Sequence, residues 1–379
     1  MPGRRGHGEG SVYQRESDGL WVGSIDLGYV NGKRKRRPLY GKTRREVTKK
    51  LAKALHEYQQ GLPVAAERLT VAQFLERWLV ASVQPSVKSK TYEGYESIVR
   101  VRVVPRIGRK QLAKLTPLDL QQLYANLQAA GLSKRSVHHT HRVLHRALRQ
   151  AVSWDLIPRN PCERVTPPRP GRSEMQVLSE EQATAFLEAT KDHPHHALYV
   201  LALTTGMRQG ELLGLRWQDV DLDAGQLAVR QTLQWQRSRG LVFTTPKTAR
   251  SRRIIILSQR AVQVLRRHRT RQLEFRLSLG EVWQDSDLVF TNEIGGPLSP
   301  SQQTRVFQRA LAAAGLPKMR FHDCRHTAAT LLLSKGVHPK VVSEMLGHST
   351  ITLTLDTYSH LVPVLHQQAA ATMDAVFGA

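Results

Sequence analysis

A cluster of prolines near the middle of the chain limits how it can fold. Between Pro158 and Pro170, five of the thirteen residues are proline. Proline has no backbone N–H and cannot continue a helix, so this stretch favours a stiff, extended connection. The chain has 379 residues, which is long enough for two or three domains. The prolines therefore predict a domain boundary, with a linker over residues 161–174.

The chain is strongly basic. It carries 56 Lys and Arg against 31 Asp and Glu, a net charge of +25, of which +8 falls on residues 1–63, +11 on 64–171 and +6 on 172–379. A single basic run is often a solvated loop, but an excess on every segment indicates a polyanionic partner. Nucleic acid fits, because each phosphate that a Lys or Arg neutralises releases a counterion.

Composition and missing motifs exclude several classes of protein. An apolar content of 40% suffices for packed cores, and no apolar run is long enough for a membrane span. The N-terminus lacks the apolar core of a secretory signal, and two cysteines, Cys162 and Cys324, suit a reducing cytosol. The sequence has no complete P-loop, zinc motif or calcium loop. We expect a cytoplasmic protein that uses neither a metal nor a cofactor.

Residues 1–63 predict a small β-sheet plus one helix. Turn signals at Asp18-Gly19 and Asn31-Gly32 separate three strand-like runs, Ser11–Gln14, Trp21–Asp26 and Lys35–Tyr40. A helix is expected over Thr43–Gln60, with Thr43 as its N-cap and Gly61 beyond its end.

Residues 64–160 predict an all-α bundle of four short amphipathic helices. The four begin after Thr70, at Thr91, at Thr116-Pro117 and at Ser133, and we expect Pro105 to end the second and Gly131 the third. One face of the fourth helix is basic, with Arg142, Arg146 and Arg149. This face is a candidate for contact with a nucleic acid backbone.

Residues 175–379 predict a mainly α domain of the α+β class with a C-terminal tail. Several helices surround three strand-like runs, Leu227–Thr232, Leu241–Thr245 and Arg252–Leu257, which we expect to form one small sheet. The alanine-rich tail beyond Pro363 favours helix but is too short to bury its own apolar groups. It is expected to dock, either on its own domain or on a neighbouring protomer.

Four local features of this last domain carry polar groups suited to chemistry. They are Thr205-Gly-Met-Arg208-Gln-Gly-Glu211; Pro246-Lys247-Thr248, expected at the tip of a hairpin; His322-Asp-Cys-Arg325-His326; and Leu346-Gly-His348, followed by Tyr358. Each feature alone has an ordinary structural explanation: a surface ion pair, a solvated lysine, a helix cap or a core tyrosine. Together they form an ordered set of cations, imidazoles and one phenol in a basic chain.

The order Arg, Lys, His-x-x-Arg, His, Tyr resembles that of the tyrosine recombinase (phage integrase) family. The resemblance is close over residues 175–360. Residues 64–160 are similar to the helical core-binding domain of that family, and residues 1–63 look like the small arm-type DNA-binding domain of integrases from phages and conjugative elements. The resemblance implies a site-specific DNA recombinase, which cuts and rejoins strands through a 3′-phosphotyrosine.

The resemblance implies a role for each residue, and elementary chemistry supports these roles. Arg208, Arg325, His322 and His348 would meet the charge on the phosphate oxygens. Tyr358 would be the nucleophile. His322 would be its base and Lys247 the general acid, while Glu211 would orient an arginine. Cys324 and His326 are expected on other helix faces, where they would pack or hydrogen-bond to the residues that contact the phosphate.

The resemblance also implies partners. They are double-stranded DNA with core and arm attachment sites, a homotetramer on that DNA, and host DNA-bending and excision factors. In a bacterium such a protein acts at the nucleoid. Two alternatives remain open at this stage, a type IB topoisomerase and a non-catalytic DNA-binding regulator. The arm-like first domain argues against the topoisomerase, and the complete set of active residues argues against the regulator.

Overall fold

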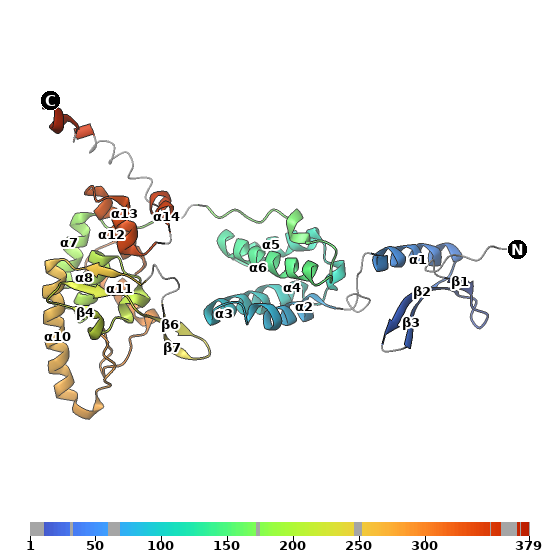
Figure 1. Ribbon diagram of the computed structural model, residues 1–379, viewed down its shortest axis with the longest axis horizontal. Helices are drawn as coiled ribbons and strands as arrows, with labels where there is room; N and C mark the ends of the chain where they lie inside the picture. Colours follow the sequence, from blue (N-terminus) through green and yellow to red (C-terminus); the bar gives the residue numbers. More distant parts are fainter. Residues whose placement is uncertain are drawn as a thin grey trace. The chain divides into compact units, whose positions relative to one another are not determined.

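The computed structural model describes residues 11–30, 33–59, 69–171, 175–245, 252–348, 350–357, 370–371 and 373–378. By its internal contacts the chain divides into an N-terminal unit, Met1–Arg172, and a C-terminal unit, Ser173–Ala379 (Figure 1). Each unit has buried hydrophobic clusters of its own. No helix of the described ranges is both long enough and apolar enough to cross a membrane.

The first part of the N-terminal unit is the predicted small sheet with its helix. Strands β1 (Ser11–Gln14), β2 (Trp21–Val30) and β3 (Lys33–Gly41) pair antiparallel in the order β1-β2-β3, and helix α1 (Arg44–Gln59) follows. Thr43 caps α1 as expected, because its Oγ1 accepts the N–H of Glu46 at 3.2 Å. Ile25 and Leu51 pack between sheet and helix. The expected turn at Asn31-Gly32 and the stop at Gly61 lie outside the described residues.

The rest of the unit is helical, as predicted. The helices are α2 (Val71–Trp78), α3 (Ser89–Ser97), α4 (Val104–Ile107), α5 (Pro117–Ala129) and α6 (Lys134–Ser153), with π-helical turns η2 (Leu79–Val83) and η3 (Ile98–Val103) and 3-10 turns η4 (Leu112–Lys114) and η5 (Pro161–Arg164). Three of the expected helix starts are confirmed, since the side chains of Thr70, Thr116 and Ser133 each accept a backbone N–H three residues on. The second helix begins at Ser89, two residues before the expected Thr91. In η5, Cys162 is buried against the bundle. The predicted extended linker over 161–174 is therefore wrong at its start, because Pro161–Arg164 form a turn that packs on the bundle.

The prediction that Pro105 ends the second helix is wrong. The helical path runs from Ser89 through η3 into α4, and Pro105 lies in the first turn of α4. In η3 the hydrogen bonds span five residues, so the N–H of Val104 bonds to the carbonyl of Val99. A proline is tolerated in the first turn that follows, where its missing N–H is not needed.

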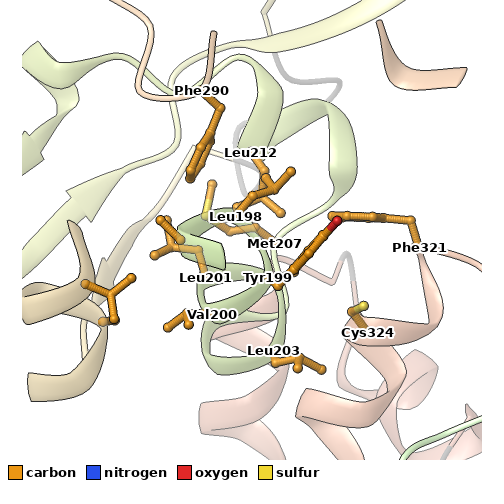
Figure 2. Close-up of a cluster of buried hydrophobic side chains, with 14 of the residues drawn as sticks. Leu198, Tyr199, Val200, Leu201, Leu203, Met207, Leu212, Phe290, Phe321 and Cys324 are labelled. Atoms are coloured by element: carbon orange, nitrogen blue, oxygen red, sulfur yellow. The ribbon is translucent and has the colours of Figure 1, made fainter. Parts of the chain in front are cut away.

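The C-terminal unit is mainly helical. Its helices are α7 (Glu180–Ala189), α8 (His196–Thr205), α9 (Gln209–Leu213), α10 (Gln259–Leu279), α11 (Pro300–Ala313), α12 (Asp323–Ser334), α13 (Pro339–Leu346) and α14 (Ile351–Thr357), with 3-10 turns η6 (Trp217–Asp219) and η8 (Gly280–Val282). Helix α8 is buried around its circumference and contacts α7, α9, α10 and α12. Figure 1 labels α8 among the other helices of this unit. Figure 2 shows its side chains Leu198 and Leu201 in this core, near Met207.

The described strands of this unit form two sheets, so the prediction of a single sheet is wrong. Strands β4 (Val220–Asp221), β5 (Gln226–Ala228) and β8 (Ile254–Ile256) pair in the order β4-β5-β8, while β6 (Thr232–Gln236) and β7 (Gly240–Thr244) form a separate hairpin. Gly240 has a φ of +70°, which permits a tight turn. Strand β7 therefore pairs with the strand just before it. Within the described ranges, β7 and β8 do not pair with each other, so the hairpin expected to carry Lys247 at its tip is not seen there.

Candidate active site

Arg208 is positioned by a left-handed turn. Gly206 ends α8 with a φ of +60°. A Cβ there would lie 2.4 Å from Cδ2 of Leu346, and this close approach together with the positive φ favours glycine. Arg208 follows as the N-cap of α9, where its backbone N–H bonds to Glu211 Oε2 at 3.0 Å. Its neighbour Met207 is anchored in the core (Figure 2), which leaves the Arg208 side chain partly exposed.

Glu211 lies behind Arg208 and holds two guanidinium groups. Its Oε1 accepts from Arg208 at 2.8 Å, and its Oε2 accepts from Arg253 at 2.9 Å. The Glu211 side chain is 4% exposed and that of Arg253 7%. Burial alone raises the pKa of this carboxyl, but the hydrogen bonds and charge of Arg253, with the charge of Arg208, bring it below its usual value. Glu211 is therefore a buried anion that orients both arginines.

Helix α12 supplies Arg325 and His322. Arg325 is 3% exposed and donates to the carbonyl of Gly206 at 2.9 Å, which links α12 to the turn that carries Arg208. His322 is the N-cap residue of α12. Its pKa is lowered to about 4, first by burial and then by the charges of His326, Arg325 and Arg208. At neutral pH the His322 imidazole is uncharged.

His348 follows a second left-handed turn. Gly347 ends α13 with a φ of +68°, and its carbonyl accepts from Arg208 at 3.4 Å. Nδ1 of His348 lies 2.7 Å from Oγ1 of Thr354 on α14. Burial lowers the pKa of His348 to about 4, with further contributions from Arg325 and Arg208. His348 is therefore a second neutral imidazole beside the two arginines.

The structure thus brings together five of the residues singled out in the sequence: Arg208, Glu211, His322, Arg325 and His348. Tyr358 and Lys247 lie outside the described residues. Cys324 is buried in the hydrophobic core, as expected (Figure 2). The ring of His326 meets that of His322 edge to face, with centroids 5.3 Å apart.

Sequence reasoning missed Arg253. Besides its pair with Glu211, this arginine donates from Nε to the carbonyl of Met345 at 2.6 Å. A signal was present in the sequence, because alternation along a strand places Arg253 on the same face as Ile255. Ile255 is 2% exposed, whereas Ile254 is 63% exposed. Because Arg252 and Arg253 are adjacent, the basic pair alone does not indicate which of the two faces inward.

The arrangement is suited to binding an anion. Arg208 and Arg325 offer planar, fixed guanidinium groups, and two uncharged imidazoles can each donate one N–H. Glu211, the carboxylate among these five residues, is paired with the buried Arg253. Within the described ranges, no group of three or more His, Cys, Asp or Glu side chains could hold a metal ion. A tetrahedral phosphate group matches this set of donors.

Comparison with known proteins identifies the family. Residues 176–363 match the model of the phage integrase family, and residues 70–128 match a phage integrase N-terminal SAM-like domain. A XerC-like tyrosine recombinase of Caldanaerobacter subterraneus is 32% identical over 92% of this chain and 93% of its own length. An integrase of Streptomyces ambofaciens is also 32% identical, over 100% of this chain and 98% of its own.

The fold has solved counterparts. The Tn1549 transposon integrase in complex with a circular intermediate DNA superposes with a TM-score of 0.66 at 24% identity, over 76% of this chain and 94% of that one. A lambda integrase dimer bound to a core site gives a TM-score of 0.58 at 19% identity, over 93% and 96%.

The chain belongs to the phage integrase family. It is a site-specific recombinase of the tyrosine type, and the comparisons favour neither the topoisomerase nor the non-catalytic regulator.

Proposed function

We propose that this recombinase cuts and rejoins DNA strands through a 3′-phosphotyrosine on Tyr358. The observation that carries the proposal is the convergence of Arg208, Arg325 and two neutral histidines, from three separate parts of the chain, around the carbonyls of Gly206 and Gly347. Attack on a phosphodiester adds negative charge to the non-bridging oxygens, and preorganised donors stabilise that charge.

The proton transfers follow from the charge states of the groups. The Tyr358 oxygen forms a bond to phosphorus while the 5′-oxygen leaves. His322 takes the phenolic proton, and its neutral state at pH 7 makes it able to do so. Lys247 gives a proton to the leaving 5′-oxygen. The new phosphotyrosine bond retains the energy of the broken one, so a 5′-hydroxyl from another strand can reverse the step.

Binding to duplex DNA is proposed for all three parts of the chain. We assign residues 1–63 to arm sites, 64–160 with the turn η5 to core sites and 175–379 to the scissile phosphate, with the rest of 161–174 as the linker. The net charge of +25 supports this. On helix α6, Arg142 and Arg149 are exposed and available for phosphates.

Assembly and location belong to the same proposal. Exchange needs four cleavages, so the working form is a homotetramer on DNA. A solved lambda integrase tetramer bound to a Holliday junction has this stoichiometry in a relative. Host DNA-bending and excision factors would act with it at the bacterial nucleoid.

The test is covalent trapping on a nicked core-site duplex. The unmodified protein forms a protein–DNA adduct that survives denaturation, and it does so in EDTA, because protein cations meet the phosphate charge. Tyr358→Phe removes one oxygen, so it binds the duplex in a mobility-shift assay but forms no adduct. An adduct of undiminished yield with Tyr358→Phe, or a cleavage step that requires magnesium, contradicts the proposal.

A further inference from the structure

Helix α14 carries a buried threonine that the recombinase chemistry described above does not use. The side chain of Thr354 is fully buried. Thr352, two residues earlier on the same helix, is exposed. The hydroxyl of Thr354 lies 2.7 Å from Nδ1 of His348. A polar side chain that is buried this completely usually has a hydrogen-bond partner.

The protonation state of His348 gives this contact a direction. Its pKa of about 4 leaves the imidazole neutral at pH 7, with one N–H shared between two nitrogens. A hydroxyl can donate to Nδ1 or accept from it. If His348 is to donate to a phosphate oxygen, the proton must reside on Nε2, and Nδ1 must then be the acceptor.

We propose that Thr354 is a positioning residue, whose hydroxyl donates to Nδ1 of His348 and so keeps the imidazole proton on Nε2 for the phosphate. This inference rests on the proposed function. The bond also joins His348 to helix α14, whose last residue, Thr357, immediately precedes Tyr358. The contact therefore connects a phosphate-binding group to the segment that leads to the nucleophile.

Three substitutions separate this role from simple packing. Thr354→Val keeps the shape and removes the hydroxyl, Thr354→Ser keeps the hydroxyl and removes a methyl group, and Thr352→Val makes the same change at the exposed position. Nitrogen NMR of histidine-labelled protein, with the His348 signals assigned by His348→Gln, reports which ring nitrogen carries the proton. Single-turnover cleavage of a nicked core site reports the effect on chemistry.

The wild-type protein should show the His348 proton on Nε2, and Thr354→Val should show a mixture of the two tautomers. Cleavage by Thr354→Val should be roughly fivefold to tenfold slower, the size of one lost hydrogen bond. Thr354→Ser should restore the tautomer and most of the rate, and Thr352→Val should match the wild type.

A wild-type proton on Nδ1 overturns the inference, whether or not the variants fold. So does a Thr354→Val protein with wild-type tautomer and rate. These results leave the proposed function intact as long as the wild type forms its adduct on Tyr358. Loss of that adduct would instead reject the proposed function.

Discussion

Removing the charge of Glu211 tests the buried network most severely. Glu211→Gln keeps the shape of the side chain but leaves Arg253, whose side chain is 7% exposed, without its countercharge. Breaking a buried ion pair by removing one partner destabilises a protein by about 3–5 kcal/mol. For a unit of this size each kcal/mol lowers Tm by roughly 2–4 °C. We therefore expect the C-terminal unit to lose at least roughly 6 °C.

The assay is differential scanning calorimetry, with Glu188→Gln as the matched control. Glu188 also pairs with an arginine, Arg260, at 2.9 Å, but the two side chains are 57% and 45% exposed. Exposed pairs contribute about 0–1 kcal/mol, so the control should keep its Tm within roughly 2–4 °C of the wild type. If Glu211→Gln lost no more than the control, the view of Glu211 as the anchor of two arginines would be refuted.

Acid titration adds an independent check on the same carboxyl. The folded-state pKa of Glu211 is depressed below its ordinary value of 4.5. The unfolded chain therefore binds the proton more readily, and the stabilisation is present above the unfolded pKa. It is lost as the pH falls from about 4.5 through the folded pKa. Glu211→Gln should lack this part of the acid dependence.

Three further predictions concern the titration of the site and the ends of the chain. His322 and His348 have folded pKa values of about 4, so the folded state resists their protonation. The free energy of unfolding should therefore fall as the pH drops from about 6.5 to 4. A Tm that stays level over this window contradicts their neutral state. Deleting residues 1–63 removes a net charge of +8. The deletion should abolish footprints at arm sites, while the affinity for core sites weakens modestly. Arm-site footprints that persist would show that this domain does not bind the arm sites. If the tail docks on a neighbouring protomer, truncation after Gln368 should leave single half-site binding intact but remove cooperative binding to paired half-sites. Unchanged cooperativity in a mobility-shift titration would reject that docking.

Local rules predicted much of this fold. The capping residues Thr70, Thr116 and Ser179 mark helix starts because a short side chain that accepts a backbone N–H three residues on satisfies an otherwise unpaired donor. The glycines Gly206 and Gly347 mark helix ends that need a positive φ. Both signals depend on a few neighbouring residues, so the sequence displays them.

Two features of the fold were not predictable in this way. Pro105 continues a helical path because π-helical turns precede it, and a local pattern of apolar residues does not reveal such turns. The strands divide into two sheets because β8 pairs with β5 and β7 pairs with β6. The choice of partner strand is set by tertiary folding.

The active site shows the same division. Arg208, His322, Arg325 and His348 occur in recognisable order along the chain. Their supports come from elsewhere: Arg253 reaches Glu211 and Met345 across the fold, and Thr354 reaches His348 from the next helix. A single sequence contains no direct record of the Arg253 contacts, because they join residues far apart in the chain. The contact of Thr354 spans six residues, but it forms only because the chain turns between His348 and α14.

The central claim is that Tyr358 becomes covalently joined to the 3′-phosphate of the cut strand. The most direct measurement is peptide mapping by mass spectrometry of the adduct trapped on a nicked core site, after nuclease trimming of the DNA. The account predicts one modified peptide, with the nucleotide on Tyr358 through its phosphate. A nucleotide on any other residue, or a cut strand with a free 3′-phosphate and no modified peptide, would contradict it.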